Sequence, residues 1–144
     1  MRTLRHHGLH NNSVQAIIQA TVVAKLIYAS PAWVGFANAA DSARLEAFLK
    51  RSVSFGYRSA SSPSFARIVD EADNKLFSNI LSNTSHLLHP LLPPLRDSHY
   101  NLRDRSYPHQ LPTRTTALRD CNFIIRMLYK KAGAQQHINL QLLD

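Results

Sequence analysis

The fold is decided by residues 13–36, SVQAIIQATVVAKLIYASPAWVGF, the longest apolar run in the chain. At the 3.6-residue period of a helix, its apolar side chains surround the axis almost completely, as in a helix that neighbours cover on every side. The run is also much longer than a typical strand of roughly 5–6 residues. We therefore predict a central buried helix that Ser13 caps, followed by a short helix that Ser30 caps and that has Pro31 in its first turn.

Two more helices are predicted on the C-terminal side of this run. Asn38 can cap the first, because Asp41 stands three residues later in a capping-box arrangement, and Gly56 can end it. Its apolar face contains Leu45, Phe48, Leu49 and Val53. Ser64 can cap the second, which Asn83 would end. The apolar face of that helix contains Phe65, Ile68, Val69, Ala72, Leu76 and Ile80.

Prolines interrupt the chain after these helices. Residues 86–94, HLLHPLLPP, are apolar but too rich in proline for a regular element, so we predict an extended strap laid over the core. Residues 98–116 mix arginines, aromatic residues and prolines without a period, which indicates a linker or surface arm. Residues 120–131 again have an apolar face and predict a last helix, with a frayed tail from Gly133.

Together these patterns predict an all-α fold. We expect a small bundle of four to five helices around a central apolar helix, with a proline-rich strap and a basic, partly disordered C-terminal arm. The predicted divisions are a helical domain over residues 1–95, a linker or basic arm over residues 96–118, and a helix with its tail over residues 119–144. The length of 144 residues and the 44% hydrophobic content suit one folded domain.

The charge balance indicates the class of partner. Lys and Arg number 17 against nine Asp and Glu, and the net charge of +8 favours a polyanion such as nucleic acid or an anionic membrane. The single Cys121 suggests a reducing compartment. The apolar run is short for a membrane span and contains Lys25, and the polar N-terminus is unlike a signal peptide. We expect an intracellular protein of the nucleus or cytoplasm, without a membrane partner.

Catalytic motifs find little support. Residues 70–73 spell DEAD, but they fall inside a helical pattern, and the chain has no GxxxxGK[ST] phosphate loop. We read them as a solvated helix face. No GxSxG motif is present, and Cys121 opens an apolar helix without a base nearby in sequence. We predict no catalytic residue and no cofactor.

The histidines could suggest a metal site. His86 and His89 have an H-x-x-H spacing, and His6, His7 and His10 cluster near the N-terminus. Zinc sites need about four ligands at defined spacing, and Cys121 has no CxxC partner. We predict capping or surface histidines and no metal.

Basic side chains are the best candidates for a binding surface. They could follow the phosphates of a nucleic acid, and arginines interleaved with Tyr100 and Tyr107 could also stack on bases. The alternative is that cations face outward only because a helix needs a polar side toward water. The predicted phosphate contacts are Arg44, Lys50, Arg51, Arg103, Arg105, Arg119, Arg126 and Lys130.

An ordered series of short segments resembles a known family. Residues 26–36 resemble the segment after the palm in reverse transcriptases of LINE-like, non-LTR retrotransposons, where a Tyr-x-Ser-x-x-Trp pattern (here Tyr28, Ser30 and Trp33) ends a thumb helix. Further matching segments are residues 40–41, 44–51, 71–73, 76–77, 80–81, 91–94, 100–103, 122–124 and 126–129, with His86 and His89. The series covers residues 4–131 in order.

The resemblance implies the thumb and post-thumb region of an RNA-directed DNA polymerase. In that family the thumb packs on the RNA–DNA duplex, and Mg²⁺ is bound by palm aspartates that nothing here matches. We therefore expect a non-catalytic fragment that contacts an RNA–DNA duplex or RNA and that lacks its palm and fingers domains. This chain departs from the family at Asp104, where relatives often have proline, and it lacks the cysteine-rich knuckle of some relatives. The alternative is a helical protein–protein interaction module with no nucleic-acid role.

Overall fold

The computed structural model describes residue 3, residues 6–96 and residues 108–141, with residues 134–141 described by their backbone alone. The described residues are mostly helical and form no strand, which confirms the predicted all-α bundle. Arg103 and Arg105 of the predicted basic arm lie outside the described residues.

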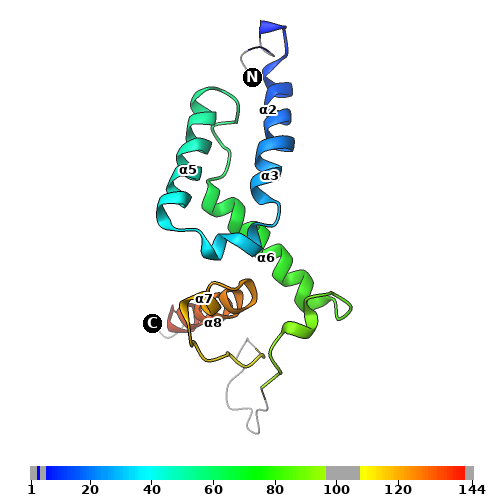
Figure 1. Cartoon of the computed structure of the whole chain (residues 1–144), viewed down its shortest axis with the longest axis vertical. Coiled ribbons are helices and arrows are strands. Elements are labelled where there is room, and N and C mark those ends of the chain that lie inside the picture. The colour runs from blue at the N-terminus through cyan, green and yellow to red at the C-terminus, as the bar shows by residue number, and fades with distance from the viewer. Residues whose placement is uncertain (1–2, 4–5, 97–107, 142–144) are drawn as a thin grey trace. The chain divides into compact units, whose positions relative to one another are not determined.

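The elements divide between two compact units, Met1–Asp73 and Asn74–Asp144, here called the N-terminal and C-terminal units (Figure 1). The boundary falls inside one helix, α6. The predicted three-part division stays a prediction. In order, the elements are α2 (Asn11–Ile18), the π-helix η1 (Gln19–Val23), α3 (Ala24–Ile27), α4 (Ser30–Trp33), the 3₁₀-helix η2 (Val34–Phe36), α5 (Ala39–Ser54), α6 (Phe65–Ser82), the 3₁₀-helix η3 (His89–Leu91), α7 (Ala117–Asp120) and α8 (Phe123–Gln141).

The apolar run forms a helix with one buried face, so the prediction of a helix covered on every side was wrong. Val14, Ile18 and Val23 are buried, whereas Tyr28 is 81% exposed. The π-helix η1 explains the difference. Five residues of α-helix rotate a side chain by about 500°, which would set Val23 about 140° away from Ile18. The wider i→i+5 turn brings the two side chains back to the same side.

The structure has other residues at the two cap positions than Ser13 and Ser30, so both predicted caps were wrong. His10, not Ser13, caps α2: the backbone N–H of Asn12 donates to its Nδ1 at 3.4 Å. Ala29, with a left-handed φ of 53°, holds the cap position before α4. Ser30 is instead the first residue of α4 and is buried. Ser30 therefore acts as a small packed side chain.

The prediction that this run is too short for a membrane was also wrong on length. By length and composition alone, Asn11–Phe36 is long and apolar enough to cross one. The left-handed Ala29 interrupts the helix between α3 and α4. The predicted absence of a membrane partner stays a prediction.

The predicted limits of α5 and α6 are confirmed. The backbone N–H of Asp41 donates to Asn38 Oδ1 at 2.7 Å, and the chain turns out of α5 at Gly56, whose φ is 70°. The backbone N–H of Arg67 donates to Ser64 Oγ at 3.3 Å, which caps α6. The helix ends one residue before Asn83. These signals are local, so the sequence alone could specify them.

The N-terminal unit closes around one apolar cluster. Side chains of α2, η1, α5 and α6 form it, so α2–α3 and α5 lie side by side (Figure 1). Trp33 stacks on Phe65 with ring centroids 6.2 Å apart, which ties the end of α4 to the start of α6. The buried members are Ile18, Val23, Leu49, Phe65, Ile68 and Val69.

The C-terminal unit has a core of its own. Its buried members are Phe77, Ile80, Phe123, Ile124, Met127 and Leu128. Leu88 and Leu92 pack against this cluster, which confirms that the segment covers the core. The prediction of an extended segment without a regular element was wrong, because residues 89–91 form the 3₁₀-helix η3. Two further differences appear. Leu95 and His109 form an antiparallel bridge where no regular pairing was expected, and α8 continues through Gly133 to Gln141.

Candidate nucleic-acid interface

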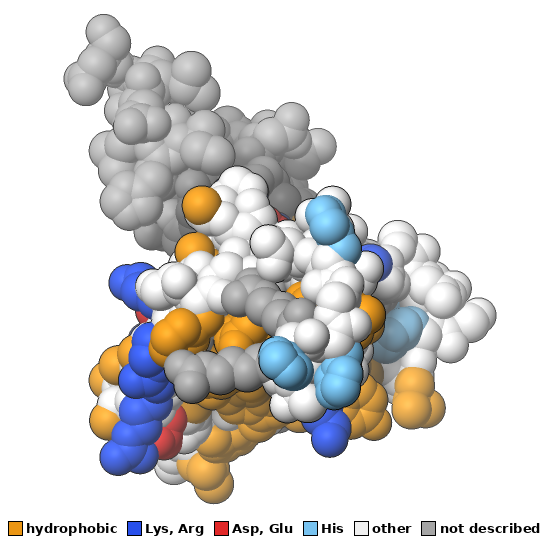
Figure 2. Space-filling view, turned by 90° about the horizontal axis from the view of Figure 1, so that it is seen from above, with side chains coloured by type: hydrophobic (Ala, Val, Ile, Leu, Met, Phe, Trp, Pro, Cys, Tyr) orange, Lys and Arg blue, Asp and Glu red, His pale blue; other side chains and the backbone are white. Residues whose placement is uncertain are grey.

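The outward side of α5 gathers three of the predicted phosphate contacts. Arg44, Lys50 and Arg51 are all exposed there, while Leu49 on the opposite side is buried in the core. The other exposed residues of α5 are small or aromatic: Ala39, Ala40, Ala43, Ala47, Phe48 and Ser54. Figure 2 shows how Lys and Arg side chains follow one another along one edge of the visible surface, with hydrophobic side chains beside them.

Negative charge is almost absent from this side of α5. The helix has two acidic residues. Asp41 lies at the margin, with its Oδ1 3.6 Å from Arg44 Nη1, and the Arg44 side chain stays 82% exposed in this pair. Such an exposed ion pair contributes little, about 0–1 kcal/mol, so it can exchange for a phosphate contact at small cost. The second acid, Glu46, is used elsewhere.

Glu46 fixes the inner side of α5 to the start of α6. The backbone N–H of Phe65 donates to Glu46 Oε2 at 2.7 Å. Arg58, also buried, donates from Nη2 to the carbonyl of Pro63 at 3.0 Å. Burial lowers the pKa of Arg58, and the charge of Glu46 partly opposes that shift. Arg58 therefore has a structural role. Because Glu46 is engaged at the start of α6, its negative charge does not occupy the basic side of α5, which stays accessible to anions.

Phe48 corrects the sequence-based reading of α5. We predicted it on the buried face, but its side chain is 41% exposed, and Phe55 after the helix is 56% exposed. Phe48 lies about 100° from the buried Leu49 around the helix, at the edge of the apolar arc. Two exposed aromatic rings beside the cations are the site feature that sequence reasoning missed. The sequence held one signal for Phe48: it lies four residues after Arg44 and three before Arg51, a spacing that places it on the same side of a helix as the two arginines.

The remaining predicted contacts belong to the C-terminal unit. Arg119 is exposed on α7, and its Nη1 donates to Thr115 Oγ1 at 3.3 Å. Lys130 is exposed on α8, whereas Arg126 is half-buried beside the core. Arg126 is thus less accessible to a phosphate than the other two.

Arg114 is anchored rather than free in an arm. Its guanidinium lies 4.2 Å from the ring centroid of Tyr129, and its Nε lies 4.0 Å from Asp120 Oδ2. The Tyr129 hydroxyl donates to the carbonyl of Pro112. These contacts tie the segment before α7 onto α8, which the sequence could not indicate because the partners are far apart in the chain.

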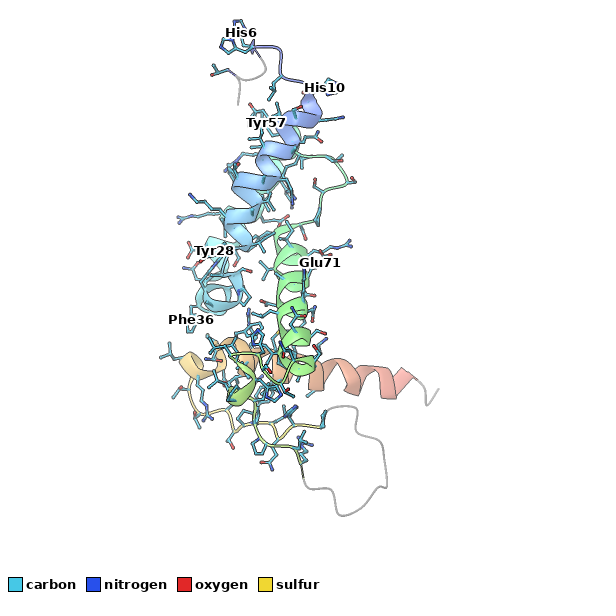
Figure 3. The ribbon with its side chains drawn as sticks, turned by 90° about the vertical axis from the view of Figure 1, so that its right-hand side faces the viewer. His6, His10, Tyr28, Phe36, Tyr57 and Glu71 are labelled. Atoms are coloured by element: carbon cyan, nitrogen blue, oxygen red, sulfur yellow. The ribbon has the colours of Figure 1, made fainter. Side chains whose placement is uncertain are left out.

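The described part of the chain holds no group of three or more His, Cys, Asp or Glu residues that could bind a metal ion. His6 and His10 lie near the start of α2 (Figure 3). His86 caps its own turn, since the Leu88 N–H donates to its Nδ1 at 3.1 Å. The predicted capping role is thus confirmed for His10 and His86.

The DEAD segment lies on α6, as predicted, but only part of it is solvated. Asp70 and Glu71 are exposed, and Glu71 Oε1 accepts from Arg67 Nε at 2.8 Å. Asp73 is 5% exposed. The prediction of a solvated face was therefore wrong for Asp73, because four consecutive helical residues cannot all face water.

Comparisons with known proteins identify no relative. No protein-family model, curated protein or solved structure matches the chain. The candidate interface is defined by its own exposed side chains.

Proposed function

We propose that this chain binds nucleic acid as a non-catalytic, helical C-terminal part of a non-LTR retrotransposon reverse transcriptase, and that basic helix faces contact an RNA–DNA duplex. The ordered sequence resemblance and the net charge of +8 support the proposal. The observation that carries it is the outward side of α5, with three exposed cations and one acid at its margin.

The spacing on α5 suits a run of phosphates. Arg44 and Arg51 are seven residues apart, or about 10.5 Å along the helix axis. One strand of a duplex has a phosphate about every 3.4 Å of axis, so the two arginines span about three phosphate steps. Lys50 lies beside them and widens the positive strip.

The test compares two variants that remove the same charge. One carries Arg44→Gln, Lys50→Gln and Arg51→Gln, and the control carries Lys25→Gln, Arg67→Gln and Lys75→Gln, which are also exposed. Fluorescence anisotropy with a labelled RNA–DNA hybrid measures the dissociation constant. We expect the α5 variant to bind about tenfold or more weakly than the control. Equal weakening in both, or no binding by the unaltered chain, would contradict the proposal.

A protein–protein interaction module is the second candidate, and one surface favours it. An open groove of about 430 Å³ is lined by Ala20, Thr21, Ala24, Lys25 and Tyr28. Tyr28 and Phe36, both labelled in Figure 3, leave large apolar surface exposed in the same unit. Such a surface promotes association when its partner is missing. Light scattering after gel filtration tests whether the chain associates with itself. A monomer at every concentration argues against this candidate.

A further inference from the structure

We propose that the outward side of α5 binds single-stranded nucleic acid through a stripe of alternating arginine and phenylalanine side chains. This inference rests on the proposed nucleic-acid function and adds a second form of nucleic acid, an unpaired strand, to the duplex proposed for this surface. The stripe consists of Arg44, Phe48, Arg51 and Phe55, at positions i, i+4, i+7 and i+11. At about 100° per residue, these four side chains fall within about 60° of one another around α5.

The exposure of both rings is the first argument. A phenylalanine side chain gains stability by burial, and α5 already has a core-facing side with Leu45 and Leu49. Phe48 and Phe55 are nevertheless 41% and 56% exposed, in line with two arginines. The ring of Phe55 lies 6.0 Å from that of Tyr57, which supports it at the end of the stripe. Both side chains therefore present part of their surface to solvent, where a flat ligand can contact it.

The rings distinguish a single strand from a duplex. In a duplex the base faces are stacked on one another, so an exposed phenyl ring cannot reach them. In a single strand the bases are free to stack on aromatic side chains while arginines hold the phosphates. The stripe is about 16 Å long, enough for a short run of nucleotides. Ala40, Ala43 and Ala47 beside it are exposed and small, so a strand can approach the helix closely.

Two other occupants fit this surface less well. A second copy of the chain would place arginines against arginines. A membrane-surface helix presents a broad apolar face to lipid, whereas the apolar side chains Leu45 and Leu49 of α5 pack in the protein core. An extended polyanion with flat, unstacked rings fits the cations and the phenyl rings together.

The experiment uses the full chain and three labelled probes of equal length: single-stranded oligothymidylate, an abasic single strand with the same phosphates, and an RNA–DNA hybrid. The variant is Phe48→Ala with Phe55→Ala. The matched control is Tyr28→Ala with Phe36→Ala, which removes two exposed rings from other elements. Far-ultraviolet circular dichroism and thermal melting check that both fold.

We expect the Phe48→Ala, Phe55→Ala variant to bind oligothymidylate about ten- to a hundredfold more weakly than the unaltered chain. Its binding to the abasic strand and to the hybrid should change less than about twofold, because neither offers an unstacked base. The control variant should bind all three probes as the unaltered chain does. A second variant, Phe48→Trp with Phe55→Trp, should keep the affinity, and its added fluorescence should be quenched by oligothymidylate.

Several results would overturn the inference. If the unaltered chain binds the abasic strand as tightly as oligothymidylate, or if the phenylalanine variant loses no affinity, stacking on the stripe is absent. Loss of self-association or of binding to anionic vesicles in that variant, with oligothymidylate binding intact, would assign the rings to another occupant. If the unaltered chain binds the hybrid but its binding to oligothymidylate is absent or does not depend on the rings, this inference alone is refuted. No binding to any probe refutes the proposed function as well.

Discussion

Ala29 is the residue at which the N-terminal helix turns, and its backbone is strained. Its φ of 53° is left-handed, a conformation that costs an L-residue with a Cβ about 1–2 kcal/mol. The turn places Pro31 in the first turn of α4 and lets Trp33 reach Phe65. The packing of Trp33 on Phe65 offsets the conformational cost at Ala29.

Replacing this residue should therefore stabilise the protein. We expect Ala29→Gly to raise the free energy of unfolding by about 0.5–1 kcal/mol, because relief of strain outweighs the added freedom of glycine in the unfolded chain. The reverse change at a second left-handed position, Gly56→Ala, should lower it by about 1 kcal/mol. Urea denaturation measures both. A loss of stability in Ala29→Gly would contradict the account.

Glu46 offers a second test at the residue scale. Glu46→Ala leaves the Phe65 N–H without its acceptor and removes the charge near buried Arg58, so we expect a loss of about 1–3 kcal/mol in the free energy of unfolding. Glu71→Ala removes only an exposed ion pair with Arg67 on the surface of α6 and should cost about 0.5 kcal/mol or less. Equal losses in the two variants, again by urea denaturation, would rule out the structural role of Glu46.

At the scale of the element, the π-helix η1 decides which face of the N-terminal helix is buried. The N–H of Ala24 donates to the carbonyl of Gln19, five residues back, and the Thr21 hydroxyl donates to the carbonyl of Ile17 at 2.6 Å. The wider turn aligns Ile18 with Val23. Apart from the exposed Tyr28, the remaining sides carry mostly small or polar residues toward water.

Deleting a residue from η1 and inserting one there should have opposite consequences. Without Ala20 the segment becomes regular α-helix, and Ile18 and Val23 stand four residues apart, about 40° around the axis, so both stay on the buried face and stability should change little. One alanine inserted after Ala20 would instead rotate every later residue by about 100° relative to α2. We expect that insertion to cost about 3 kcal/mol or more, comparable with emptying a core position. Similar stability of the two variants, by thermal melting, would show that the orientation of the residues after η1 is not important.

The contrast between α5 and the N-terminal helix shows what sequence can predict. The starts of α5 and α6 depend on Asn38 and Ser64, whose side chains bond to residues three positions away, so the sequence specifies them. The helical wheel assumed 3.6 residues per turn, and a single π-turn changes every later position on it. The basic residues of α5 were found in advance, while the exposure of Phe48 depended on how α6 and η1 cover the helix.

At the scale of the whole chain, each of the two units has a separate apolar core. Met127→Ala in the C-terminal unit should cost about 2–5 kcal/mol. We expect amide hydrogen exchange to speed up most in α8, while protection in α2 and α5 changes less. Val23→Ala should give the opposite pattern. Equal loss of protection across the chain in both variants would mean that the two cores do not open independently of each other.

The salt dependence of binding tests the central claim, that exposed cations on α5 hold phosphates. The dissociation constant for the RNA–DNA hybrid is measured between 50 and 200 mM salt, values typical of such a series. If Arg44, Lys50 and Arg51 each contact one phosphate, log affinity should fall against log salt with a slope of about −3, and the triple glutamine variant should lose most of that slope. A slope near zero, or an unchanged slope in the variant, would contradict the account.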